Sequence, residues 1–391
     1  MDLPDELLHL RGRRGGEAAM AAVIGDDDLL REIPLRLGFP AFLVHAALVS
    51  KRWLRVAADT VFLRRFRDRH PPRILGFYVN HCSTLRTVFV SVSEARELRY
   101  AVNRAGFHHC NQSVRIADSR NGRLLLRSLP FGCGGYTMFS PLCPARGVLP
   151  IRLPPELLHI GRLSPLDYSS QCLYLLFRDN NDGIVLVSVR LSGRKLSARV
   201  YVGQSDAWGE AILAEGELPV PLKFVRSMMI VNDKLYIVLD NCYICGLDFV
   251  APRLRLFVVK VPDKVGADFK LSHGDDSGLF LIHRDRFHLS VWNHQMDDNG
   301  EDRWELVDRF VVRAAQDRHE RFRVCAVSED GGFVFLCLWT SRTIISVDLR
   351  SRKETTYEIK VQGIYFTTIF PLMTIWPPTF PTLNDEDDHD E

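Results

Sequence analysis

The sequence lacks a long uninterrupted hydrophobic segment. No stretch approaches the roughly 18 to 20 consecutive apolar residues that a transmembrane helix needs. The best candidate, residues 364–380, is interrupted by Pro371, Pro377 and Pro378, so we expect no membrane span. The opening residues MDLPDELLHL are acidic and have no small-residue cleavage site after an apolar run. We therefore expect no secretory signal peptide.

The chain also has little net charge. Its 50 Lys and Arg residues nearly balance its 48 Asp and Glu residues, for a formal net charge of +2. A dedicated nucleic-acid-binding protein is usually much more basic. Basic side chains do gather between residues 51 and 73, but without the interleaved aromatic residues on which bases stack. We expect no nucleic-acid partner, and favour for this run a solvated helix face or a match to an acidic protein.

The nine cysteines show no disulfide framework. Their number is odd and they are scattered along the 391 residues, which is typical of reduced thiols in the cytoplasm or nucleus. Cys242 and Cys245 form a lone CxxC, and no second pair lies at the spacing of a zinc site. His108, His109 and Cys110 have no further ligand group nearby. We therefore predict structural cysteines and no bound metal.

Motifs of catalysis and cofactor binding are missing as well. The chain has no GxxxxGK phosphate loop, no GxGxxG, no GxSxG nucleophile elbow and no HExxH. Residues 179–182 favour a hairpin turn over a calcium loop, since no bidentate glutamate follows at EF-hand spacing. We predict no catalytic residues, no cofactor and no enzymatic activity.

Helical patterns occupy residues 26–70. Asp26, Asp27 and Asp28 can cap a first helix, which Pro34 should kink or shift and Gly38 should end. A second helix can begin at Pro40, and a third can begin after Asp59, a good N-cap residue. The second helix carries a continuous apolar stripe at helical spacing, formed by Phe42, Ala46, Val49, Trp53 and Val56.

The rest of the chain, to about residue 383, is rich in short β patterns. Turn residues separate many apolar runs, which is typical of an all-β sandwich, barrel or propeller. The pattern recurs roughly every 45–60 residues, close to the size of a propeller blade, so we favour a propeller. The clearest strand patterns span residues 121–128, 171–179, 183–191, 233–240, 253–261, 277–284, 331–339 and 342–350.

Residues 26–70 resemble the F-box of the large plant families, and of cereals in particular. The matching stretches are DDDLLREIPLRL and LVSKRWLRVAADTVFLRRFRDRH, and the contexts SDAWGEA and EDRWELV resemble the β-propeller-like regions of the same families. The resemblance implies a small three-helix F-box that binds a Skp-type adaptor and, through it, a cullin. It also implies that the all-β domain recruits an unknown substrate protein for ubiquitination. The adaptor-binding residues that it implies are Leu29, Leu30, Ile33, Leu37, Leu48, Val49, Lys51, Trp53 and Leu54.

The expected organisation has four parts. Residues 1–25 form a flexible leader, 26–70 the F-box and 71–383 the all-β domain. Residues 384–391, NDEDDHDE, form an acidic disordered tail, because like charges repel one another. An alternative stays open at this point, in which the β domain is a protein- or ligand-binding module and the F-box is degenerate, with no ligase role.

Overall fold

The computed structural model describes most of the chain between residues 27 and 380. The leader at 1–25 and the tail at 384–391 lie outside the described residues, as do His108–Cys110, Cys242 and residues 179–182. The described ranges are 27–38, 40–70, 73–81, 87–91, 114–128, 135–142, 147–157, 171–177, 183–203, 207–221, 224–231, 234–239, 243–248, 255–266, 268–273, 278–296, 302–329, 331–338, 340–341, 343–358, 366–374, 378 and 380.

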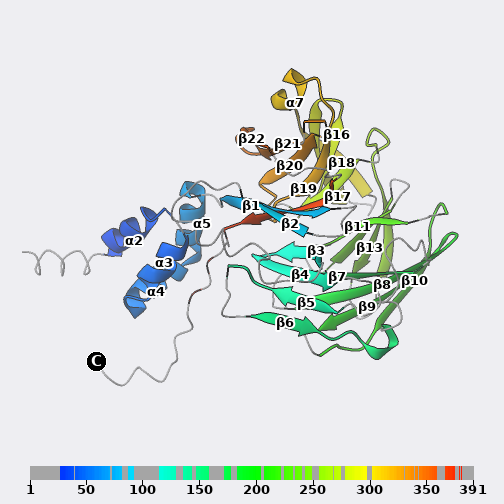
Figure 1. The fold of residues 1–391 in the computed structure, drawn as a ribbon, viewed down its shortest axis with the longest axis horizontal. Coiled ribbons are helices and arrows are strands. Elements are labelled where there is room, and N and C mark those ends of the chain that lie inside the picture. Colours follow the sequence, from blue (N-terminus) through cyan, green and yellow to red (C-terminus); the bar gives the residue numbers. More distant parts are fainter. Residues whose placement is uncertain are drawn as a thin grey trace, which may run out of the picture. The chain divides into compact units, whose positions relative to one another are not determined.

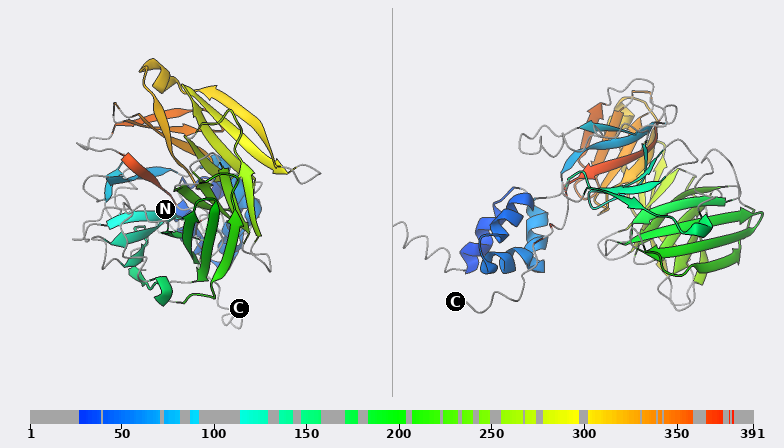
Figure 2. Two further views of the ribbon diagram at one scale, coloured as in Figure 1. Left: turned by 90° about the vertical axis from the view of Figure 1, so that its right-hand side faces the viewer. Right: turned by 60° about the horizontal axis from the view of Figure 1, so that its bottom comes forward.

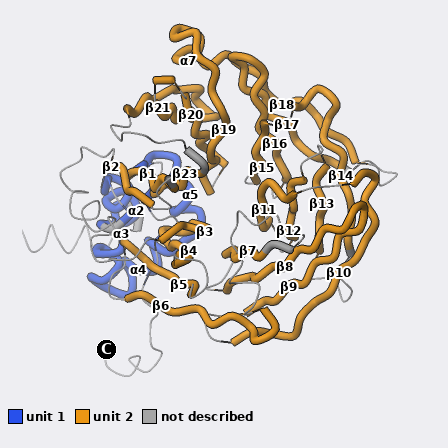
Figure 3. The backbone as a smooth tube through the Cα atoms, turned by 45° about the vertical axis from the view of Figure 1, so that its right-hand side comes forward, with its two compact units in different colours: residues 1–74, 373–391 blue, residues 75–372 orange. Residues whose placement is uncertain are grey.

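The chain divides into two compact units. One contains residues 1–74 and 373–391, and the other contains residues 75–372 (Figure 3). Among the described residues, the first unit is mainly helical and the second is mainly β-sheet. The division assigns the segment after residue 372 to the helical unit, where Phe380 packs against the helical core. Within the described ranges, no helix is long and apolar enough to cross a membrane.

The helical unit contains four described helices, which Figure 1 shows in blue. They are α2 (Asp27–Leu35), α3 (Pro40–Ala47), α4 (Lys51–Ala58) and α5 (Thr60–Arg69). The small core of this unit consists of Leu35, Leu43, Ala47, Leu54, Ala57, Phe62 and Phe66. A core of this size is typical of a small domain with limited stability of its own.

The single second helix predicted from Pro40 to Val56 is wrong. The chain leaves the helix after Ala47 and starts a new helix at Lys51. Ser50 adopts an extended conformation there, and its hydroxyl accepts a hydrogen bond from the Trp53 amide at 3.3 Å. Serine competes with the backbone in this way and favours the N-cap over the helix interior. The apolar periodicity continues across this break, so the periodicity alone does not show that the helix is interrupted.

The ends of the other helices follow their capping residues. Asp59 was predicted to cap the third helix, and its carboxylate accepts the Phe62 amide at 2.8 Å at the start of α5, which confirms the prediction. Pro34 lies inside α2, which ends one residue later. The first helix was expected to continue to Gly38, but it ends at Leu35. Beyond Leu35 the chain continues as a tighter turn, in which the Arg36 amide donates to the Ile33 carbonyl and the Leu37 amide to the Pro34 carbonyl, each at 3.0 Å.

In the residues that the structure describes, the second unit contains six β-sheets arranged around a central axis (Figures 2 and 3). Five of these sheets have four described strands and one has three. We number these blades in ring order. Blade 1 contains β1 (Ile74–His81), β2 (Thr87–Ser91) and β23 (Phe366–Met373). Blade 2 contains β3 (Val114–Arg120), β4 (Arg123–Ser128), β5 (Tyr136–Phe139) and β6 (Val148–Ile151), and blade 3 contains β7 (Gln171–Phe177), β8 (Ile184–Ser192), β9 (Lys195–Gly203) and β10 (Ile212–Glu217).

The remaining blades repeat the same antiparallel meander. Blade 4 contains β11 (Val225–Val231), β12 (Lys234–Leu239), β13 (Tyr243–Asp248) and β14 (Arg255–Lys260). Blade 5 contains β15 (Phe269–His273), β16 (Leu279–Asp285), β17 (His288–Met296) and β18 (Asp302–Val311), and blade 6 contains β19 (Phe322–Val327), β20 (Phe333–Leu338), β21 (Thr343–Asp348) and β22 (Glu354–Glu358). The short helices η3 (Pro155–Leu157) and α7 (Arg313–Asp317) lie between blades 2 and 3 and between blades 5 and 6 along the chain.

This arrangement is a six-bladed β-propeller, which confirms the preferred fold prediction over a sandwich or a barrel. All eight sequence runs predicted as strands coincide with strands of the structure. The apolar core lies between successive blades, since clusters of buried side chains join blades 1 and 2, 2 and 3, 3 and 4, 4 and 5, and 5 and 6. Each blade thus buries both of its faces against its neighbours.

The ring is closed by strands from the two ends of this unit. In blade 1, β1 and β2 from the beginning of the propeller share a sheet with β23 from its end. The Phe77 ring then packs edge-on against Phe335 and Tyr357 of blade 6, with ring centroids 5.4 Å apart in both cases. Closure protects sheet edges that would otherwise be left open to pairing with other chains.

Two tryptophans connect neighbouring blades by equivalent hydrogen bonds. The Trp208 Nε1–H in blade 3 donates to the Arg152 carbonyl, just after the outer strand of blade 2, at 2.6 Å. The Trp304 Nε1–H in blade 5 donates to the Lys260 carbonyl at the end of the outer strand of blade 4, at 2.9 Å. Each indole therefore fastens its own blade to the preceding one, which gives these two sequence contexts a structural role.

Candidate functional site

The turn between α3 and α4 presents apolar side chains to solvent. Leu48 is 62% exposed and Val49 is 69% exposed. Their backbones are nevertheless held in place, because the Leu48 amide donates to the Val44 carbonyl at 3.2 Å and the Val49 amide donates to the Ala46 carbonyl at 3.1 Å. Large apolar side chains on a fixed turn are typical of a contact surface for another protein.

The structure separates the predicted adaptor-binding residues into three groups. Leu30 and Leu54 are buried, so they support the helical unit from within. Ile33, Leu37, Lys51 and Trp53 are partly exposed. Leu29, Leu48 and Val49 are exposed, and Phe42 and Val61, which the resemblance did not single out, are exposed as well.

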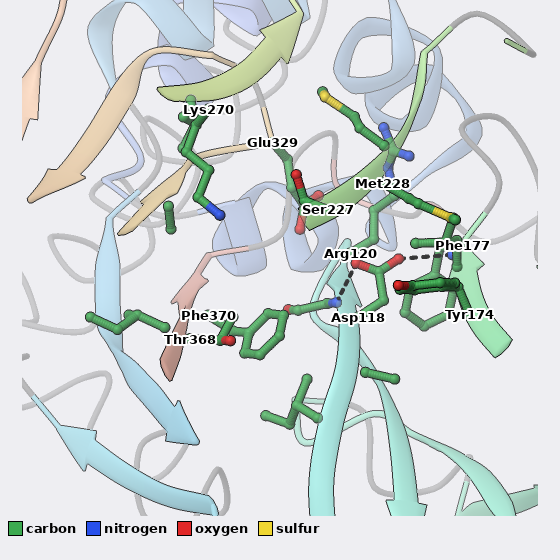
Figure 4. Close-up of a pocket in the computed structure, with 18 of the residues that line it drawn as sticks. Asp118, Arg120, Tyr174, Phe177, Ser227, Met228, Lys270, Glu329, Thr368 and Phe370 are labelled. Atoms are coloured by element: carbon green, nitrogen blue, oxygen red, sulfur yellow. Dashed lines mark hydrogen bonds between the residues drawn. The ribbon is translucent and has the colours of Figure 1, made fainter. Parts of the chain in front are cut away.

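A cavity of about 640 Å³ lies at the centre of the propeller. It is lined mainly by the innermost strands β3, β7, β11, β15, β19 and β23 (Figure 4). Its volume lies within the range of roughly 300–1,000 Å³ that is usual for ligand sites. No sequence pattern indicates this site, because its residues come from segments far apart in the chain that only ring closure brings together.

Both apolar and charged side chains line the cavity. Met228, Tyr174 and Phe370 contribute apolar surface. Six Arg and Lys side chains also line it, against two carboxylates. The cations are Arg115, Arg120, Arg127, Arg226, Lys270 and Arg323, and the carboxylates are Asp118 and Glu329.

The two carboxylates have structural partners. Asp118 accepts the Phe177 amide of blade 3 at 2.9 Å and its neighbouring Ser119 amide at 2.9 Å. Both oxygens of Glu329 accept the Asn121 amide, each at 2.7 Å. The contacts with Phe177 and Asn121 connect different blades. All of these contacts use carboxylate lone pairs that a cationic ligand would otherwise occupy.

Lys270 points into the cavity from β15 (Figure 4). Its ammonium group has no hydrogen bond or salt bridge to any residue that the structure describes. Burial lowers the pKa of its ammonium group, and Arg323 lowers it further, while Cys325 and Asp268 act in the opposite direction. Lys270 is partly exposed, and the surrounding protein disfavours the charged form of its ammonium group.

Cys325 lines the same cavity at an irregularity in β19, where the pairing with β20 shifts by one residue. A hydrogen bond with Cys337 lowers the pKa of the Cys325 thiol, and Lys270 and Arg323 lower it further, while burial opposes them. The same hydrogen bond and burial raise the pKa of the Cys337 thiol. Among the described residues, no group of three His, Cys, Asp or Glu side chains could hold a metal ion.

Comparison with known proteins places the propeller in a family. Residues 115–380 match the family described as "F-box protein AT5G49610-like, beta-propeller". The chain belongs to this family. The match covers most of the propeller and none of the helices α2–α5. Among curated protein sequences, none matches this chain significantly.

Solved structures of low sequence identity match parts of this chain. The periplasmic gluconolactonase PpgL of Pseudomonas aeruginosa is 15% identical, with 77% of this chain and 100% of that chain covered and a TM-score of 0.38. A putative 6-phosphogluconolactonase of Bacteroides fragilis is 11% identical, with 76% and 98% covered and a TM-score of 0.38. A prolyl endopeptidase is 14% identical, with 61% of this chain and 33% of that chain covered and a TM-score of 0.33. At these scores the neighbours say nothing about function.

Proposed function

We propose that this protein is the substrate-recognition subunit of an SCF-type cullin–RING ubiquitin ligase. The helical unit binds a Skp-type adaptor, and through it the cullin, while the propeller holds a target protein. The observation that carries the proposal is the coexistence, in one chain, of an F-box-protein propeller with a separate helical unit that exposes Leu48 and Val49. We further propose that the protein acts in the cytoplasm, the nucleus or both.

The chain itself performs no chemistry in this proposal. Ubiquitin transfer takes place on other subunits, and tethering raises the effective concentration of the target beside them. The adaptor contact consists of the exposed apolar side chains of the α3–α4 turn, together with the partly exposed Trp53 in the first turn of α4. Lys51, Arg52 and Arg55 add positive charge on α4, which would orient an acidic adaptor and speed its docking.

Co-purification with a Skp-type adaptor tests the proposal. The full-length chain should bind the adaptor, and the double variant Leu48→Asp, Val49→Asp should bind at least about tenfold more weakly, since interface hot spots commonly contribute about 2 kcal/mol or more. Both side chains are already exposed, so the double variant should keep its circular dichroism spectrum.

Leu213→Asp is the matched control. Leu213 is 61% exposed, nearly the same as Leu48, but it lies on β10 of the propeller. This variant should bind the adaptor like wild type. Absence of adaptor binding by the wild-type chain would contradict the ligase role, and so would equal losses in the control and the double variant.

A further inference from the structure

Four of the innermost strands carry a basic residue at the same position. The second residue of β3, β11, β15 and β19 is Arg115, Arg226, Lys270 and Arg323, respectively. In β15 the flanking Phe269 and Leu271 are buried, and β3 and β19 show the same alternation. The basic side chains therefore leave the inter-blade core, and all four line the cavity.

The topology brings these four positions to one end of the cavity. In blades 2 to 6 the chain enters at the innermost strand and moves outward through an antiparallel meander. A four-stranded meander ends antiparallel to its first strand, so the next blade is entered from the same end. The second residues of the inner strands thus lie at one level, and we call Arg115, Arg226, Lys270 and Arg323 the cationic ring.

Little negative charge compensates the Lys270 side of the ring. Asp268 forms an ion pair with Arg323, whose Nε lies 3.3 Å from its Oδ1, and a second with Arg284, whose Nε lies 3.4 Å from its Oδ2. Two guanidinium groups therefore share one carboxylate. Within the described part of the chain, the Lys270 ammonium group has no hydrogen bond or salt bridge, and burial lowers its pKa. An anion beside Lys270 would restore the interactions that its ammonium group lost on leaving water.

The rest of the cavity wall indicates the kind of ligand. Met228, Met229, Tyr174 and Phe370 provide apolar surface next to the cationic ring. Methionine side chains adapt to varied apolar partners, and a cavity of about 640 Å³ accepts a few side chains but no folded domain. A ligand that combines clustered negative charge with apolar groups matches both parts of the wall.

We propose that the cationic ring binds an acidic peptide segment of the protein that the propeller recruits. The carboxylates of the segment contact Lys270 and its neighbouring arginines, and its apolar side chains lie against the methionines. The choice of a protein as the source of the anion rests on the function proposed above. The presence of an anion site in the cavity does not depend on that function.

Peptide binding to the full-length chain, without any adaptor, tests this inference. The probes are a fluorescein-labelled peptide of alternating Glu and Leu, the same peptide with Gln for Glu, and inorganic pyrophosphate as competitor. We expect the Glu peptide to bind and the Gln peptide not to bind. Lys270→Met should weaken binding about ten- to a hundredfold, the usual loss for a charge-assisted contact, whereas Lys270→Arg should retain most of it.

Lys195→Met is the matched control. Lys195 is exposed at the start of β9, and its substitution changes the net charge by the same amount as Lys270→Met. It should leave peptide affinity within about twofold, because surface charges far from a site are largely screened by salt. A circular dichroism melt of each variant shows whether the propeller is folded.

The outcomes separate this inference from the proposed function. If the Glu peptide does not bind, or if both methionine variants weaken it equally, the cationic ring does not bind acidic peptides. If only pyrophosphate binds, in a manner that depends on Lys270, the cavity is a site for small anions and the peptide proposal is wrong. Peptide binding that depends on Lys270 in a chain that fails to bind the adaptor would support this inference and contradict the ligase role.

Discussion

The side chain of Asn80 forms with the backbone of Ile116 the two hydrogen bonds that a paired strand would form. Its Nδ2 donates to the Ile116 carbonyl at 3.0 Å, and its Oδ1 accepts the Ile116 amide at 3.2 Å. Asn80 is 3% exposed and lies on β1 of blade 1, and Ile116 lies on β3 of blade 2. Thr87 donates to the same Oδ1 at 2.7 Å. A single amide group thus joins two blades next to the central cavity.

Replacement of Asn80 by Leu should destabilise the propeller by roughly 2–4 kcal/mol. The substitution leaves the Ile116 amide and carbonyl buried without these partners, and each such group costs about 1–3 kcal/mol. Urea unfolding followed by tryptophan fluorescence measures the effect. Gln295→Ala, which removes only an exposed hydrogen bond to Glu305, should change stability by less than about 0.5 kcal/mol. Equal effects of the two substitutions would contradict the inter-blade role of Asn80.

Replacement of Asp59 by Ala should destabilise the helical unit by about 1 kcal/mol. The Asp59 carboxylate satisfies the Phe62 amide at the start of α5, and loss of an N-cap usually costs about 0.5–2 kcal/mol. Asp59→Asn should restore most of the loss, because asparagine caps about as well. Hydrogen exchange at the α5 amides is the measurement, and equal protection in the Ala and Asn variants would contradict the capping role.

Replacement of Gly331 by Ala should be more destabilising than replacement of Gly193 by Ala. Both glycines have a left-handed backbone, with φ of +67° and +60°, so each variant should lose about 1 kcal/mol from that conformation alone. A methyl group at Gly193 meets open space, whereas one at Gly331 overlaps the His273 carbonyl. The overlap should add about 1–3 kcal/mol. Thermal unfolding of the two variants tests the difference, and similar melting temperatures would show that the backbone near His273 yields.

The free energy of unfolding should decrease as the pH is lowered below about 6.5, because of His283. Burial lowers the pKa of this imidazole below its ordinary value of 6.5, and the nearby Asp285 and Asp268 only partly oppose this effect, while Arg284 and Arg309 add to it. The neutral Nε2 accepts the Gly266 amide at 3.0 Å. Between the pKa of His283 in the folded chain and 6.5, the unfolded chain binds a proton that the folded chain does not. The free energy of unfolding therefore rises with pH in this range, and the contribution of His283 is lost on acidification.

The variant His283→Gln isolates this contribution. Its free energy of unfolding should depend less steeply on pH below about 6.5 than that of wild type, by up to about 1.4 kcal/mol per pH unit. Urea unfolding at several pH values between about 5 and 8 provides the comparison. Parallel curves for the two proteins would show that His283 titrates equally in the folded and unfolded chain.

Much of the local structure could be predicted from the sequence. The cap at Asp59, the start of α3 at Pro40 and all eight β runs depend on residues close together in the chain. The break at Ser50 was missed because the apolar stripe continues across it, and only the hydrogen bond to Trp53 shows that the serine caps a new helix. Helix and strand propensities depend on a few neighbouring residues, so patterns in the sequence are enough to predict these local elements.

The candidate sites depended on contacts between distant residues. Leu30 and Leu48 both appear in the apolar pattern of the helical region, yet one is buried and the other is 62% exposed. The basic residues of the cationic ring stand about one or two blades apart in the sequence and look like ordinary strand residues. Closure of β1 and β2 onto β23 places the inner strands around one axis, so those scattered charges share a single cavity. Hydrophobic periodicity indicates which side chains point away from the apolar core. The packing of the blades decides whether those side chains face solvent, a neighbouring blade or the central cavity.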